Sequence, residues 1–76
     1  MPRFFFDIED GVFVRDEEGL ELDGQDAIRR EAAKAITAIA SDAAQGGAFP
    51  TLVLTVRDMA DQTVLRVRLV CSIEDL

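Results

Sequence analysis

Acidic side chains crowded between residues 16 and 21 are the first candidates for chemistry in this sequence. Asp16, Glu17, Glu18 and Glu21 offer several carboxylate oxygens, which are the ligands that hard divalent cations prefer. The calcium-loop pattern of alternating Asp or Asn with a glycine and a final Glu is missing. No apolar segment encloses the cluster to raise the pKa of one carboxyl for acid–base work. We therefore expect a solvated turn, with no metal and no cofactor.

Pro2 is a second candidate, because removal of Met1 would expose a secondary amine. An α-amino group titrates near pKa ~8, so a modest downward shift would make it a general base. Some small tautomerases use such a proline, with arginines that bind an acidic substrate. Their first strand leads directly into a long helix, whereas a hairpin signal at Asp10-Gly11 intervenes here. A proline tautomerase is therefore kept as an alternative to a non-enzymatic protein.

Histidine is absent and Cys71 is the only cysteine. These two facts exclude an internal disulfide, zinc sites built on imidazole or several thiolates, Ser-His-Asp triads and Cys-His dyads. We expect Cys71 to lie on the buried side of the last strand as a small apolar residue.

Charge is unevenly distributed along the 76 residues, whose net charge is −7. Residues 1–26 hold nine acids against two bases, Arg3 and Arg15, and the remainder is balanced. An acidic chain gains nothing from counterion release, so no nucleic-acid partner is expected. No apolar run approaches the ~20 residues of a membrane helix, and the apolar N-terminal run is too short for a signal peptide. We expect one cytoplasmic domain over residues 1–76.

A helix is predicted over residues 24–45. Asp23 is the expected N-cap, and Asp26 lies near the positive end of the helix dipole. Gly46-Gly47 should end the helix and Pro50 should prevent it from resuming. The apolar stripe recurs at helical spacing in Ile28, Ala32, Ala35, Ile36, Ile39 and Ala43.

Two hairpins flank this helix. Period-two alternation predicts strands over 3–8 and 12–14, joined at the two-residue turn Asp10-Gly11, and over 51–58 and 63–71. Whether Leu20-Glu21-Leu22 joins the sheet is left open. The fold class is α+β: a ββαββ chain forming a four-stranded antiparallel sheet with one helix packed on one face. The order 2-1-3-4 makes every neighbouring pair antiparallel.

The sheet face away from the helix is the candidate functional surface. It mixes apolar side chains with arginines, which is typical of an interface. The alternatives are arginine stems that merely cover valines, or an anionic ligand or single-stranded RNA stacked on Phe5. The candidate interface residues are Arg3, Phe5, Arg57, Val64, Arg66, Arg68 and Val70. We expect a non-enzymatic interaction module that forms a homodimer or binds a protein partner. A homodimer would use this open face rather than the edge of the last strand, where the charges of Arg66 and Arg68 discourage pairing.

The chain also resembles known families. Pro2-Arg3-Phe4-Phe5-Phe6, Asp10-Gly11, Asp16-Glu17-Glu18-Gly19 and the Glu- and Ala-rich helix start are similar to a family of short α-proteobacterial proteins of unknown function. The resemblance implies a stand-alone ββαββ domain and no particular activity. The order of elements and the acidic charge are also similar to HicB-type antitoxins. That second likeness implies a regulatory module that binds a basic partner.

Overall fold

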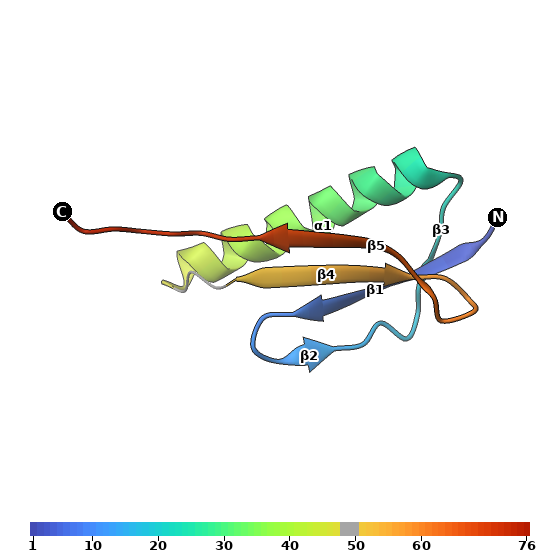
Figure 1. Ribbon diagram of the computed structural model, residues 1–76, viewed down its shortest axis with the longest axis horizontal. Helices are drawn as coiled ribbons and strands as arrows, with labels where there is room; N and C mark the ends of the chain where they lie inside the picture. Colours follow the sequence, from blue (N-terminus) through green and yellow to red (C-terminus); the bar gives the residue numbers. More distant parts are fainter. Residues whose placement is uncertain (48–50) are drawn as a thin grey trace.

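The computed structural model describes residues 1–47 and 51–76. Along the chain the elements are β1 (Arg3–Glu9), β2 (Phe13–Val14), β3 (Leu20–Glu21), α1 (Gln25–Gln45), β4 (Leu52–Arg57) and β5 (Thr63–Leu69). The sheet is antiparallel throughout, and α1 lies behind it in Figure 1. The predicted α+β class with one covered face is confirmed. The helix is not long and apolar enough to cross a membrane, and no other described helix is present.

Strand order is β2-β1-β4-β5, with β3 also paired to β1. This is the predicted order of the two hairpins. The difference is a fifth strand: Leu20 and Glu21 lie opposite Phe4 and Arg3, so the sheet has five strands rather than four. β2 and β3 lie along the same edge of β1 but at opposite ends, because β2 pairs with Ile8 and Glu9 whereas β3 pairs with Arg3 and Phe4.

The core lies between α1 and β4. Three residues spaced four apart on the helix, Ile28, Ala32 and Ile36, are buried against the sheet. Their counterparts are every second residue of β4, as the period-two pattern requires. These are Leu52, Leu54 and Val56. Phe4, Phe6 and Ile8 of β1 pack against the same cluster.

Two helix-end predictions have different outcomes. Asp23 is not the N-cap: Gly24 takes that position with φ 98°, and no side chain caps the helix. Its carbonyl oxygen accepts the Ile28 N–H at 3.2 Å, and the positive φ is one that glycine adopts without strain. Gly46 ends the helix as predicted, with its N–H donated to Asp42 and Ala43. The prediction for Pro50 lies outside the described residues.

Three local differences affect the strands. Glu9 pairs with Phe13, so the first hairpin has a three-residue loop, in which the Asp10 carboxylate accepts the Val12 N–H, instead of a two-residue turn. In β5, a register shift opposite Val56/Arg57 turns Val64 toward the core. Finally, β5 stops at Leu69, so Cys71 is exposed rather than buried.

Candidate interaction surface

An ion pair divides the helix-free face of the sheet into two halves. Arg57 at the end of β4 donates from Nε to the Asp7 carboxylate at 2.9 Å. Both side chains are nearly buried, at 11% and 6% exposure. Arg57 also lies 4.6 Å from the centre of the Phe5 ring. The part of the face around Arg57 and Phe5 is called the inner half. The part that begins at Asp7 and extends to Glu9 on β1, Val53 on β4 and Arg68 on β5 is called the outer half.

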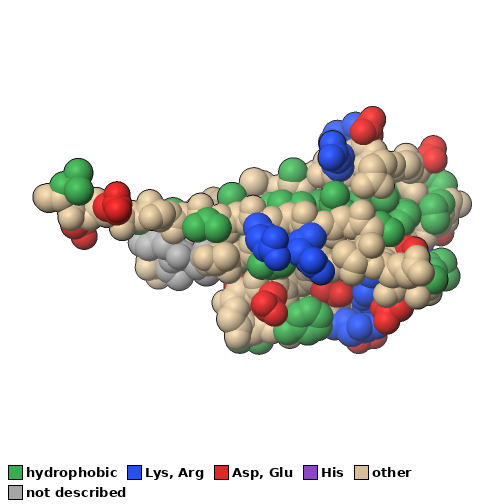
Figure 2. Space-filling view, in the orientation of Figure 1, with side chains coloured by type: hydrophobic (Ala, Val, Ile, Leu, Met, Phe, Trp, Pro, Cys, Tyr) green, Lys and Arg blue, Asp and Glu red, His purple; other side chains and the backbone are tan. Residues whose placement is uncertain are grey.

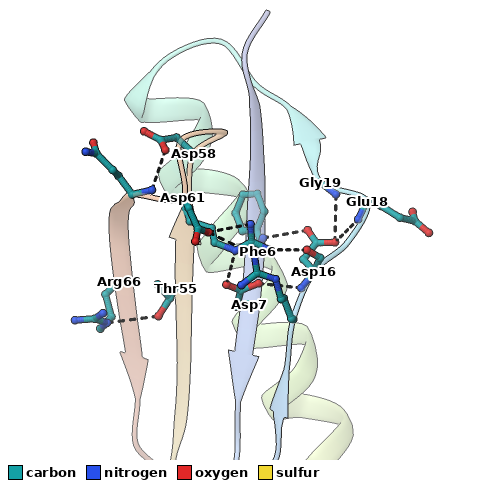
Figure 3. A network of polar contacts seen from close by, with 12 residues as sticks. Phe6, Asp7, Asp16, Glu18, Gly19, Thr55, Asp58, Asp61 and Arg66 are labelled. Atoms are coloured by element: carbon teal, nitrogen blue, oxygen red, sulfur yellow. Dashed lines mark hydrogen bonds and ion pairs between the residues drawn. The ribbon is translucent and has the colours of Figure 1, made fainter.

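Asp16 ties the 15–19 segment over the inner half (Figure 3). One of its carboxylate oxygens accepts the Phe6 N–H of β1 at 3.0 Å, and the other accepts the N–H groups of Glu18 and Gly19. Its own N–H is donated to Asp7, and its carbonyl accepts Arg57 at 2.7 Å. The carboxylate thus accepts a strand N–H in the gap between β2 and β3, where this edge of β1 has no backbone partner among the described residues.

The same contacts set the ionisation of this network. Burial alone would raise the pKa of Asp16, but the hydrogen bonds from Phe6, Gly19 and Glu18, with the Arg57 charge, outweigh burial. The pKa of Asp16 is therefore below its ordinary value of 3.8. The hydrogen bond to Asp7 raises the pKa of Arg57 above its ordinary value. Both groups are held in their charged forms.

Gly19 brings the segment into contact with the sheet. Its φ is +72°, and a Cβ built on it would lie 2.8 Å from the Phe5 ring and 2.9 Å from Cγ of Arg3. Arg3 donates to the Glu18 carbonyl oxygen at 2.7 Å. Three predicted interface residues, Arg3, Phe5 and Arg57, are therefore engaged by the chain itself.

The outer half is open. Register places Asp7, Thr55 and Arg66 in one cross-strand row, and Glu9, Val53 and Arg68 in the next. With Phe13 they line a shallow groove of about 260 Å³. Figure 2 shows basic side chains gathered near the middle of this face, with acidic and apolar side chains below them.

Arg66 and Arg68 are exposed on β5, which forms one edge of the sheet. Arg66 donates to the Thr55 hydroxyl at 3.4 Å, and neither arginine has an ion-pair partner among the described residues. Beyond β5 the chain continues as an extended, exposed segment (Figure 1), residues 70–76, which we call the tail. Val70 and Ile73 are 65% and 60% exposed there.

Of the predicted interface set, the structure thus brings only Arg66, Arg68 and Val70 to one free edge. Val64 packs against the core. The engagement of Arg57 was missed, although one sequence signal pointed to it: Asp7 is an acid inside an otherwise apolar strand, and a buried acid requires a partner.

The other candidates for chemistry are placed as follows. Asp16 uses its carboxylate on backbone N–H groups, and the described residues contain no group of three or more acidic or cysteine side chains arranged to hold a metal ion. Pro2 is exposed, and its carbonyl accepts the Leu22 N–H. β2 lies between β1 and the helix along the chain, as the Asp10-Gly11 signal predicted, and β3, which the sequence left open, lies there too.

The fold and this surface define a small α+β domain in which the helix covers one face of the sheet and the outer half of the other face is open among the described residues. Residues 3–70 match a family described as a domain of unknown function (DUF6894), and the chain belongs to that family. The expected membership in a family of small proteins of unknown function is confirmed. No curated protein and no solved structure matches the chain, so the likeness to HicB-type antitoxins stays a prediction.

Proposed function

We propose that this protein is a non-enzymatic interaction module that self-associates along the β5 edge of its sheet. One observation carries the proposal: β5 is a seven-residue edge strand with no outer partner among the described residues, and it continues into an exposed apolar segment. An edge of this length presents a row of backbone N–H and C=O groups that another strand can use. The inner half of the face is a poorer candidate, because the 15–19 segment already covers it.

A second copy suits this edge by charge. Arg66 and Arg68 are basic, whereas the chain as a whole carries −7. An acidic segment of another copy would therefore be attracted to the edge, and opposite charges across an interface favour association. The arginines would disfavour a basic protein at the same place. A strand junction buries less area than a standard interface, so we expect a dissociation constant in the micromolar range.

The test is the absolute mass in solution, by light scattering between about 10 and 500 µM. We expect a dimer of twice the 8.4 kDa chain mass at high concentration. Val70→Asp should shift the protein to monomer. Val12→Asp is the matched control, because Val12 is equally exposed (67%) but lies on the first hairpin. A parent that is monomeric throughout would refute self-association. Equal dimers in both variants would refute the β5 edge as its location.

A further inference from the structure

We infer that the strand received by β5 is the tail of the second copy, in a twofold antiparallel junction centred on Val70. Each copy would then give its tail and receive one, and the two sheets would become continuous. This inference rests on the proposed self-association and specifies its partner segment and its register. The tail continues from β5 in extended conformation (Figure 1) and is exposed along residues 70–76.

Side-chain alternation restricts the possible registers. Leu65, Val67 and Leu69 face the helix side of the sheet. A straight continuation of the strand brings Cys71 and Ile73 to the same side. A junction keeps apolar residues on one side only if each residue pairs with one from the same side. In a twofold junction this requires the symmetry axis to pass through a residue, which then lies opposite itself.

The charges of the paired residues then distinguish among the residues through which the symmetry axis, or centre of the junction, could pass. A junction centred on Arg66, Val67 or Arg68 sets arginine opposite arginine, and like charges directly opposite each other are destabilising. A centre at Leu69 leaves both arginines opposite uncharged residues. A centre at Val70 places Arg66 opposite Glu74, twice by symmetry, and Val67 opposite Ile73 on the helix side.

The next centre along is the closest competitor. With Cys71 opposite itself, Arg68 would face Glu74, but Asp75 would lie opposite Val67 on the apolar side. A carboxylate there would lose water without gaining a partner. The Val70 centre sets Asp75 opposite Leu65, also on the helix side, but one residue farther from the centre of the junction and beyond the Arg66–Glu74 pair. It pairs Arg66 with Glu74 and keeps the central apolar pairs of the helix side, Leu69 with Cys71 and Val67 with Ile73, free of any charged residue.

Charge-reversal variants test the register. Arg66→Glu and Arg68→Glu each change the net charge by −2, from −7 to −9, so they are matched in overall charge. In the proposed register Arg66 faces Glu74, whereas Arg68 faces Ser72. We expect R66E to raise the dimer dissociation constant roughly tenfold or more, because the pair occurs twice, and R68E to raise it far less. R66E/E74R restores the pair in reverse and should return the constant to near its parent value.

Cysteine placement gives an independent readout. In a pair of opposite residues the Cα atoms lie about 4.5–5.5 Å apart, within the range of a disulfide. Val70→Cys combined with Cys71→Ser should therefore form a disulfide-linked dimer under mild oxidation. The parent Cys71, which would lie opposite Leu69, should form one much more slowly. Faster linkage through the parent Cys71 would indicate the competing centre and overturn the inference.

The outcomes separate the two proposals. A parent protein that never dimerises refutes the proposed function itself. A parent that dimerises, with R66E and R68E equally affected and no rescue in R66E/E74R, leaves self-association standing and refutes the tail register. A light-scattering series on all four proteins, with circular dichroism to show that each is folded, decides between these results.

Discussion

Adding one methyl group at Gly19 should destabilise the protein strongly. The chain passes Gly19 with φ +72°, and the added Cβ of Gly19→Ala would lie 2.8 Å from the Phe5 ring and 2.9 Å from Cγ of Arg3. Neither neighbour moves freely. The Phe5 ring is stacked on Arg57, and Arg3 is hydrogen-bonded to Glu18. The segment that covers the inner half would therefore have to lift.

The expected size follows from two contributions. A left-handed conformation costs a residue with a Cβ about 1–2 kcal/mol, and overpacking at a tight contact costs about 1–3 kcal/mol. Together they give about 2–5 kcal/mol for Gly19→Ala. At about 0.05–0.15 kcal/mol per residue, a 76-residue domain has a total stability of about 4–11 kcal/mol. The variant should therefore lose between about a fifth and all of its stability.

Gly11→Ala is the matched control. Gly11 also has a positive φ, +98°, but its added Cβ would meet nothing within 4 Å. It should lose only the conformational contribution. The measurement is urea unfolding followed by far-ultraviolet circular dichroism, because the chain has no tryptophan or tyrosine to report by fluorescence. If the two variants lose the same free energy of unfolding, the contact between Gly19 and Phe5 is not as described.

Three further predictions concern stability. The pKa of Asp16 is lowered in the folded state, so the ionised carboxylate should add to the free energy of unfolding fully well above pH 3.8, and this addition should be lost as the pH falls through the lowered pKa. The urea midpoint, measured between pH 2 and 7, should therefore fall less steeply with decreasing pH in Asp16→Asn than in the parent protein. Asp7→Ala removes the nearly buried carboxylate that Arg57 contacts at 2.9 Å and leaves the arginine only the Asp16 carbonyl and the exposed Asp61 carboxylate, so it should cost about 3 kcal/mol in urea unfolding. Glu9→Ala, at an exposed position of the same strand, should cost less than about 0.5 kcal/mol. Ala32→Leu should lower the thermal midpoint, because Ala32 is fully buried and overpacking costs about 1–3 kcal/mol, whereas the exposed Ala33→Leu should leave the midpoint almost unchanged.

Much of this fold could be predicted because its elements have clear periods. The helix stripe and the alternation of β4 and β5 are strong signals, and antiparallel pairing of neighbours then limited the strand order. Element ends were less predictable, because they depend on single contacts. Asp23 is a good N-cap by type, yet the chain turns at Gly24, whose positive φ suits glycine. β5 stops at Leu69, where its pairing with Leu52 at the start of β4 ends.

The candidate surface was predictable only in part, because alternation shows which face a side chain occupies and not what covers it. Arg57 and Arg66 share one face, and the sequence pattern treats them alike. The structure separates them through Asp16, which comes from a segment with no periodicity of its own. A return of that segment across β1 depends on three-dimensional contacts, including the close approach at Gly19.

The two edges of the sheet differ in how far their backbone N–H and C=O groups are paired, and this difference bears on the proposed role of β5. At the β1 edge, β2, β3 and the Asp16 carboxylate together take up backbone groups of the strand. At the β5 edge the described residues provide no such cover, only exposed arginines at alternate positions. Charged side chains on an edge usually discourage pairing. That effect depends on the approaching strand: arginine repels a copy that sets Arg66 against Arg66 and attracts one that sets it against Glu74. In the proposed junction the arginines of this edge would therefore select the register, a role that a fully blocked edge could not have.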